Sequence, residues 1–159
     1  MPVSTPVTLR PLGRKEFAQL DYAVMRHAFD CQNQLGRLCA ENIYQNDLAA
    51  RLDAVGIQAQ REVRVTVTHR EFTKSYWLDL VVADAAIYEC KVHAMLVGEH
   101  EAQLLNYLFL CGANHGKLVN FRPAQVESKF INSALTPEQR REFHVETDRW
   151  QEREPSDVM

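Results

Sequence analysis

One predicted β-hairpin places two acidic side chains opposite each other. Residues 76–92 read YWLDLVVADAAIYECKV, two apolar runs around a turn centred on Asp84. Asp79 and Glu89 are equally far from Asp84, so they should face each other with roughly 5 Å between their Cβ atoms. Side chains alternate along a strand, so Lys91 shares the face of Glu89. Opposed like charges destabilise a sheet unless something neutralises them, and a divalent cation, which prefers carboxylate oxygens, is the simplest neutraliser.

The two faces of this hairpin differ in polarity. Alternation assigns one face the side chains of Trp77, Asp79, Val81, Ile87, Glu89 and Lys91. The other face is apolar throughout and should carry Leu78, Leu80, Val82, Tyr88, Cys90 and Val92. Apolar residues on both faces predict a sheet that is covered on both sides, which would leave the opposed acids in a buried place.

Composition narrows the class of protein. The chain has 159 residues, enough for one domain, with 46% apolar and 25% charged residues, as in an ordinary globular protein. Its net charge of −3 argues against a protein that wraps long DNA, because no global positive field is present. A small catalytic site for nucleic acid is compatible with that charge.

The cysteines and the apolar runs indicate the cellular compartment in which we expect the chain. The four cysteines show no C-x-x-C pair and no zinc-like spacing, so we interpret them as buried free thiols in a reducing, cytoplasmic setting. The first residues contain no apolar signal-peptide core. No stretch approaches the ~20 apolar residues of a membrane-spanning helix, so we expect no membrane partner.

Apolar periodicity predicts the remaining elements. Helices are expected from Gly13 to about Leu35, at about 38–54 and over Glu99–Cys111, and strands at 57–68 and Lys117–Phe121. A strand, a buried helix and another buried strand indicate a βαβ crossover, and hence a partly parallel sheet. Gln103 and Tyr107 lie four residues apart on the last of these helices and so share a face.

The two ends of the chain differ from its middle. Residues 1–14, with three prolines, are expected to be an irregular lead-in to a domain at 15–133. Thr136 and Pro137 form a helix-start signal, which predicts a C-terminal helical extension at 134–159 with a helix over about 137–152. That helix would dock on its own domain or form the interface of a homodimer.

One strand edge is locally basic inside this acidic chain. Its basic residues are Arg61, Arg64, His69, Arg70 and Lys74. One interpretation is a solvated strand edge protected from pairing by its charges. The other is a surface that contacts the phosphates of a nucleic acid.

The order of acids and lysine resembles a known signature. Asp79 followed by Glu89-x-Lys91 on the next strand is similar to the motif of the PD-(D/E)XK phosphodiesterase superfamily. Within it, LGRLCAENIYQNDLAARL at 35–52 resembles the Glu-bearing motif of the GxxExxR proteins, and HEAQLLNYL at 100–108 with LVNF at 118–121 looks like that family's next helix and strand. The resemblance covers roughly residues 22–121.

Two positions depart from the family pattern. Leu38 stands where the family usually has glycine, and Tyr44 stands where its name has arginine. The resemblance nevertheless implies a fold class: an α/β restriction-endonuclease-like three-layer core with a central mixed four- to five-stranded sheet flanked by helices. The C-terminal helix lies outside the matched region.

The resemblance also implies a metal site. Asp79 and Glu89 would hold one or two Mg²⁺ ions, with Mn²⁺ as a substitute and the backbone carbonyl of Cys90 as a further ligand. Glu41, on the helix at 38–54, would complete the metal shell directly or through water. Tyr44 is a weaker candidate, as a hydroxyl near the same face.

Two further side chains would act on the substrate. Lys91 would lie beside the attacking water and lower its pKa or neutralise charge developing on the phosphate. Gln103 would orient the water, Lys91 or a phosphate by hydrogen bonds. His100 is interpreted as a structural histidine.

Three functions are consistent with these residues. The first is a Mg²⁺-dependent nuclease-like phosphodiesterase that acts on nucleic acid, DNA or RNA, through a metal-activated water. The second is a non-catalytic binding or assembly module that reuses the fold. In the third, Asp79, Glu89 and Lys91 form a buried structural ion cluster.

Overall fold

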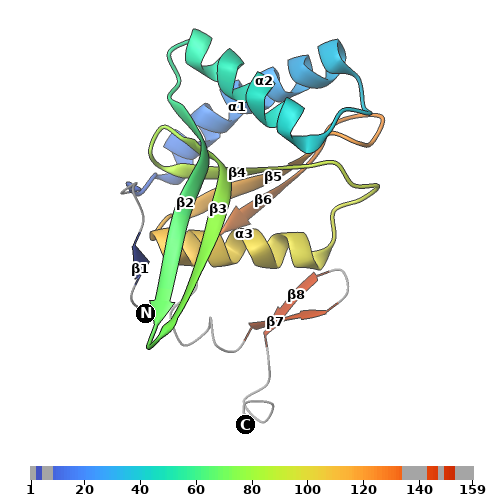
Figure 1. Cartoon of the computed structure of the whole chain (residues 1–159). Helices are drawn as coiled ribbons and strands as arrows, with labels where there is room; N and C mark the ends of the chain where they lie inside the picture. Colours follow the sequence, from blue (N-terminus) through green and yellow to red (C-terminus); the bar gives the residue numbers. More distant parts are fainter. Residues whose placement is uncertain (1–2, 5–8, 134–142, 147–148, 153–159) are drawn as a thin grey trace.

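A computed structural model of the chain describes residues 3–4, 9–133, 143–146 and 149–152, and side chains within 9–133. Its core is a six-stranded mixed sheet in the order β1-β2-β3-β4-β5-β6, with helices on both faces (Figure 1). The elements are β1 (Val3–Ser4), α1 (Arg14–Leu35), α2 (Glu41–Ala54), β2 (Ala59–His69), β3 (Phe72–Val82), β4 (Ala86–Lys91), α3 (Gly98–Cys111), β5 (His115–Asn120) and β6 (Glu127–Asn132). A separate hairpin is formed by β7 (Phe143–Glu146) and β8 (Arg149–Glu152).

The parallel part of the sheet is the predicted crossover. β4 and β5 run parallel and are joined by α3, whereas the other neighbouring strands of this sheet are antiparallel. A Cβ atom on Gly116 of β5 would lie 2.9 Å from the carbonyl oxygen of Ile87 and 3.1 Å from Cδ1 of Leu104. The absence of a side chain at Gly116 therefore lets α3 pack directly on the sheet, and the mixed three-layer prediction is confirmed.

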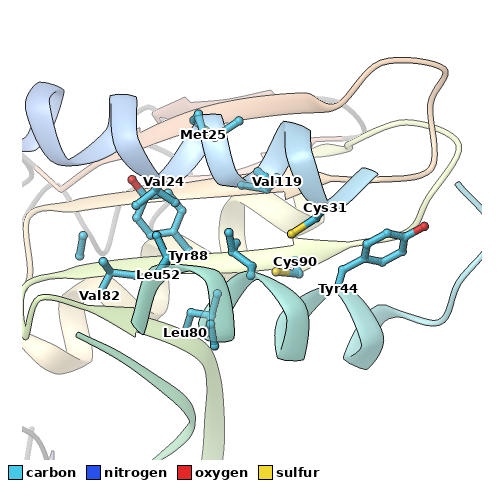
Figure 2. Close-up of a cluster of buried hydrophobic side chains, with 14 of the residues drawn as sticks. Val24, Met25, Cys31, Tyr44, Leu52, Leu80, Val82, Tyr88, Cys90 and Val119 are labelled. Atoms are coloured by element: carbon cyan, nitrogen blue, oxygen red, sulfur yellow. The ribbon is translucent and has the colours of Figure 1, made fainter. Parts of the chain in front are cut away.

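Two apolar clusters hold the helices on opposite faces of the sheet. The first lies between α1, α2 and one face, and Figure 2 shows its side chains gathered between these two helices and the strands. Its members include Val24, Ala28, Cys31, Tyr44, Leu48, Leu52, Leu80, Val82, Tyr88, Cys90 and Val119. The second lies under α3 and includes Val63, Val65, Leu78, Val81, Ile87, Leu104, Leu105, Leu108 and Leu118. Burial of these side chains, at about 25 cal/mol per Å² of apolar surface, is the main favourable term in this fold.

The central hairpin has the predicted register. Pairing of β3 with β4 begins at Leu80 opposite Tyr88 and is centred on Asp84. Ala83 and Asp84 adopt left-handed φ angles of 55° and 54° to make the turn. Arg10 supports the turn, since its amide donates to the Asp84 carbonyl at 2.9 Å and its Nε to the Ala83 carbonyl at 3.1 Å. Part of the predicted irregular lead-in thus contributes to the hairpin.

The predicted faces of the hairpin are wrong for Leu78 and, with it, for its neighbour Trp77. Leu78 packs in the α3 cluster beside Val63, and not with Leu80 on the opposite face. The β2–β3 ladder skips the position where Glu62 would pair with Asp79, and Glu62 has a left-handed φ of 51°. This local distortion interrupts the alternation of side chains, so residues on its two sides belong to different face patterns.

The bounds of α1 agree with those predicted from the sequence, whereas the start of α2 does not. α1 spans the predicted range, but α2 begins at Glu41 and not at about residue 38. Leu38 is 85% exposed and lies outside the helix. The glutamate therefore occupies the first position of α2, where the helix dipole favours a negative charge.

The predicted C-terminal helix is wrong where the structure describes that stretch. Residues 143–146 and 149–152 are antiparallel strands that pair with each other, with Val145 opposite Trp150. In 143–146 apolar and polar residues alternate, as suits a strand, and the helix-start signal at Thr136 lies outside the described residues. Within the described part of the chain, no helix is long and apolar enough to cross a membrane.

Tyr44 supports the start of α2, and its hydroxyl bonds to the connection between α1 and α2. Its ring is fully buried and stacks on Phe121, with 4.4 Å between ring centroids and 5° between ring planes. Its hydroxyl donates to the Gly36 carbonyl at 2.5 Å and accepts from the Cys39 amide at 3.4 Å. The weaker functional role predicted for this hydroxyl is therefore replaced by a structural one: it ties the α1–α2 connection to the helix that carries Glu41.

Replacing Tyr44 with phenylalanine should lower stability without affecting any activity. Tyr44→Phe removes the hydrogen bonds to the Gly36 carbonyl and the Cys39 amide, which should cost about 1 kcal/mol of unfolding free energy. Urea unfolding followed by circular dichroism measures the change. Tyr22→Phe, at a residue that is 75% exposed, is the matched control and should stay within about 0.5 kcal/mol of the original protein. Equal stability of the two variants would contradict the structural role.

Candidate functional site

The predicted acids lie at a fork in the sheet. Pairing of β3 with β4 extends from the turn only as far as Leu80 and Tyr88. Beyond that point β3 continues beside β2 alone and β4 beside β5 alone, and the two strands diverge in Figure 1. Asp79 and Glu89 are the next residues on the two arms. The fork therefore brings together the two side chains that the register predicted to be opposite.

Each acid bonds to the main chain of the other arm. The Asp79 amide donates to Oε2 of Glu89 at 2.8 Å, and the Cys90 amide donates to Oδ2 of Asp79 at 2.9 Å. These two bonds take the place of the backbone ladder, which ends one residue earlier. They also fix both carboxylates in the fork, with Oδ1 of Asp79 and Oε1 of Glu89 outside these bonds.

Burial makes the fork unfavourable for negative charge. Glu89 is only 2% exposed and Asp79 is half-buried. Burial raises the pKa of Asp79, against the lowering effects of its Glu89 and Cys90 hydrogen bonds and of the Lys91 charge. The pKa of Glu89 lies well above its usual range, first because of burial and then because of the charge on Asp79. Without a cation, the pair resists full ionisation.

Glu41 approaches the fork from α2. It is half-buried, and its pKa is raised by burial first and then by the charge of Asp79, while Lys91 lowers it. The charges of Asp79 on β3 and Lys91 on β4 therefore both act on the Glu41 carboxylate. Among the described residues, no three Asp, Glu, His or Cys side chains form a ready metal-binding group.

Lys91 is held by the predicted glutamine. Its Nζ donates to Oε1 of Gln103 at 2.7 Å, which links β4 to α3. Within residues 9–133, no ion pair joins Lys91 to Asp79 or Glu89. Among these residues, the two acids and the lysine therefore do not form a closed structural ion cluster. The ammonium lies close enough to influence the acids electrostatically but bonds to a neutral amide.

Tyr107 is a site residue that the sequence analysis did not select. It is buried one helical turn after Gln103. Burial raises its pKa most, the charges of Glu89 and Asp79 raise it further, and a hydrogen bond with Gln103 lowers it. Its ring also meets Tyr76 edge-on, with 5.7 Å between centroids. The sequence signal for Tyr107 was its spacing of four from Gln103. The apolar residues around it made Tyr107 resemble an ordinary core residue.

Two histidines lie beside the lysine. The rings of His93 and His100 are 4.5 Å apart between centroids. Burial, then His93, then Lys91 lower the pKa of His100. Nδ1 of His100 accepts a hydrogen bond from the Val97 amide at 3.1 Å, which closes the first turn of α3. This contact agrees with the interpretation of His100 as a structural histidine.

The donor set of the fork suits a hard divalent cation. Two opposed carboxylates each have one oxygen outside their amide bonds, and the Cys90 peptide lies beside them because its amide bonds to Asp79. Mg²⁺ and Mn²⁺ favour such oxygen ligands and retain several waters. A cation here would also offset the burial that raises the pKa values of both acids and the Asp79 charge that raises that of Glu89.

The chain is similar to a family model and, more distantly, to a solved structure. A solved structure of the protein SSO0001 resembles the chain with a TM-score of 0.42 and 16% sequence identity, over 74% of this chain and 78% of that one. No curated protein matches. The family model of the PD-(D/E)XK nuclease superfamily matches residues 18–132, which include both acids, Lys91, most of α1 and all of α2 and α3. Because that match covers most of a chain with a restriction-endonuclease-like mixed sheet, the protein belongs to the PD-(D/E)XK nuclease superfamily.

Proposed function

We propose that the chain is a Mg²⁺-dependent phosphodiesterase that hydrolyses nucleic acid, with Mn²⁺ as a substitute. The observation that carries this proposal is the Asp79–Glu89 pair, fixed by reciprocal amide bonds with one oxygen of each acid left over. Within the superfamily we assign the chain to the GxxExxR proteins, because residues 35–52 and 100–108 match the motifs of that family in order and spacing.

The acids and the Cys90 peptide would hold the metal. Asp79 and Glu89 supply the carboxylate oxygens, and the Cys90 carbonyl is the proposed third protein ligand. Glu41 would complete the metal shell directly or through water, since its carboxylate interacts with Asp79. When bound, the cation supplies a water of lowered pKa and neutralises charge on the phosphate, so a histidine base is not needed.

Lys91 would contact the reacting phosphate. Its ammonium lies beside the fork, where it can hydrogen-bond to a non-bridging phosphate oxygen and stabilise the charge that develops there. Gln103 holds that ammonium in place through the 2.7 Å hydrogen bond, and Tyr107 supports Gln103 from the next turn of α3. Gln103 and Tyr107 are thus positioning residues that act through Lys91.

A reducing, cytoplasmic setting fits this activity. All four cysteines are free thiols, and burial raises the pKa values of Cys31 and Cys90. High thiol pKa values make these residues unreactive, as expected of packing cysteines.

Metal binding should depend on both acids. Isothermal titration calorimetry with Mg²⁺ or Mn²⁺ should detect binding by the wild-type chain, and Asp79→Asn or Glu89→Gln should weaken it at least about tenfold because each removes a charged ligand. Asp30→Asn, at an exposed position on α1, is the control and should bind as the wild type does. Equal affinity of all four proteins would refute the metal site.

The acid pair should make metal-free stability fall as pH rises. Both folded-state pKa values are raised, so above about pH 4 the unfolded chain releases these protons before the folded chain does. The contribution of the pair to the free energy of unfolding is therefore most favourable at low pH. It is lost as the pH rises to the raised pKa values of the folded state.

Asp79→Asn measures this contribution. In EDTA, the melting temperature of Asp79→Asn relative to wild type should increase between about pH 4 and 8, and saturating Mg²⁺ should reduce that trend by stabilising the wild type. A difference that is constant with pH would mean that the two carboxyl groups do not oppose each other's ionisation.

Lys91 should be needed for cleavage and not for metal binding. Lys91→Ala should retain Mn²⁺ affinity but lower the cleavage rate by about 100-fold or more, the usual cost of losing one charge-stabilising donor. Labelled single-stranded and duplex DNA and RNA are the substrates, and Lys15→Ala, exposed at the start of α1, is the control. A wild-type chain that binds Mn²⁺ and cleaves none of these substrates would instead be a non-catalytic binding module.

A further inference from the structure

The β2–β3 hairpin extends past the fork and has one open face. On its inner side, Val63, Val65 and Leu78 are buried against the α3 cluster. The opposite side carries three cross-strand pairs whose members are exposed or half-buried. These pairs are Arg64 with Trp77, Thr66 with Ser75, and Thr68 with Thr73. We call these six residues the Trp77 face.

Trp77 is the unusual member of this face. Its side chain is 55% exposed, although tryptophan is one of the largest apolar residues and its chain neighbour Leu78 is 1% exposed. Trp77 precedes Asp79 by two positions on β3, which corresponds to about 7 Å along a strand. An exposed indole therefore lies next to the acids of the fork along the same strand.

Hydroxyl groups and one guanidinium line the rest of the face. Arg64 donates from Nε to Oγ of Ser75 at 3.0 Å, and Ser75 shares a hydrogen bond of 3.2 Å with Thr66. Thr68 and Thr73 form a similar pair at 3.3 Å. The contact with Ser75 holds Arg64 along the ribbon, so its positive charge stays on the face that bears Trp77.

The charge of this segment differs from that of the whole chain. Residues 59–78 contain four Lys or Arg and two Glu, whereas the chain has a net charge of −3. Of these bases, Arg61 already pairs with Glu62 at 3.8 Å, and Lys74 lies over the Tyr76 ring on the other side of the ribbon. Arg70 lies in the turn between β2 and β3, and Arg64 is the base whose contacts direct it along the Trp77 face.

We propose that the Trp77 face binds single-stranded nucleic acid and leads it to the acids at the fork. One unpaired base stacks on the Trp77 indole, and Arg64 contacts the backbone phosphate beside it. The hydroxyl pairs offer further polar contacts along the ribbon. This inference rests on the proposed nuclease function and names its substrate class.

The choice of a single strand follows from the chemistry of the face. An isolated exposed aromatic ring offers a stacking surface to an unpaired base, whereas bases in a duplex already stack on each other. Binding by an extended polyanion also explains why a basic, aromatic ribbon occurs in an acidic chain. A purely solvated strand edge, the other interpretation of the basic residues, would not require an exposed tryptophan next to the acids.

Oligonucleotide binding by the full-length chain tests the proposal independently of cleavage. Fluorescence anisotropy in EDTA, with labelled oligothymidine, oligouridine and a duplex DNA as probes, should show tighter binding of one or both single strands than of the duplex. Trp77→Ala should weaken single-strand binding at least about fivefold through loss of one stacked base, and Trp77→Phe should retain most of it. Arg64→Gln should weaken binding and reduce the salt dependence by about one phosphate contact.

Matched variants separate this role from a loss of folding. Tyr22→Ala, an exposed aromatic on α1, and Arg26→Gln, an exposed arginine on the same helix, should bind as the wild type does. Thermal melting followed by circular dichroism checks that each variant is folded, and Trp77→Thr, which suits a strand and lacks a ring, keeps the comparison valid if Trp77→Ala unfolds. Duplex binding as tight as single-strand binding, no binding at all, or unchanged affinity of a folded variant that lacks the ring at position 77 would overturn the proposal.

The outcome is distinguishable from failure of the proposed activity. Single-strand binding that depends on Trp77, without cleavage in Mn²⁺, would keep this inference and reject the phosphodiesterase. Cleavage that depends on Lys91 and is unaffected in Trp77→Ala would keep the phosphodiesterase and reject the Trp77 face as its substrate track.

Discussion

The reciprocal hydrogen bonds between the two acids and the opposite main chain organise this protein. Asp79 accepts from the Cys90 amide, and Glu89 accepts from the Asp79 amide, at the point where the β3–β4 ladder stops. If the pairing of β3 with β4 continued, main-chain amides at this point would bond to backbone carbonyls. The two carboxylates would then need other hydrogen-bond partners. Because the strands separate here, the acids satisfy the amides, and the sheet opens into the fork that forms the site.

Without a bound cation, this arrangement of carboxylates lowers the stability of the folded chain. With a cation, the same carboxylates would serve as its ligands. Burial raises the pKa values of both acids, the charge of Asp79 raises that of Glu89 further, and Glu41 adds a third carboxylate nearby. Lys91 does not neutralise the pair by direct contact, since its ammonium bonds to Gln103. A divalent cation in the fork would satisfy the carboxylates while leaving Lys91 for a phosphate, which is the division of labour that the proposed hydrolysis requires.

The sequence was sufficient for features that depend on regular geometry. The strand period of two and the symmetry about Asp84 placed the acids opposite each other, and the family resemblance placed Gln103 near Lys91. Irregular features were missed. The left-handed Glu62 that turns Leu78 onto the α3 side has no marker in the residue pattern, since glutamate rarely adopts that conformation. At 143–152, a helix-start signal outweighed the strand alternation, although that stretch pairs as two strands.

The same irregularity connects the fork to the open ribbon. With regular alternation from Leu80 back along β3, Leu78 would have pointed to the α1–α2 side, and Trp77 would have faced α3. The break at Glu62 and Asp79 instead buries Leu78 under α3, so alternation places Trp77 on the outer side. One distorted pair thus has two consequences: it ends the regular sheet at the acids, and it turns the neighbouring indole outward. A substrate strand that stacks on Trp77 would therefore meet the acids where the face ends, which is why the ribbon and the fork are best understood as one site.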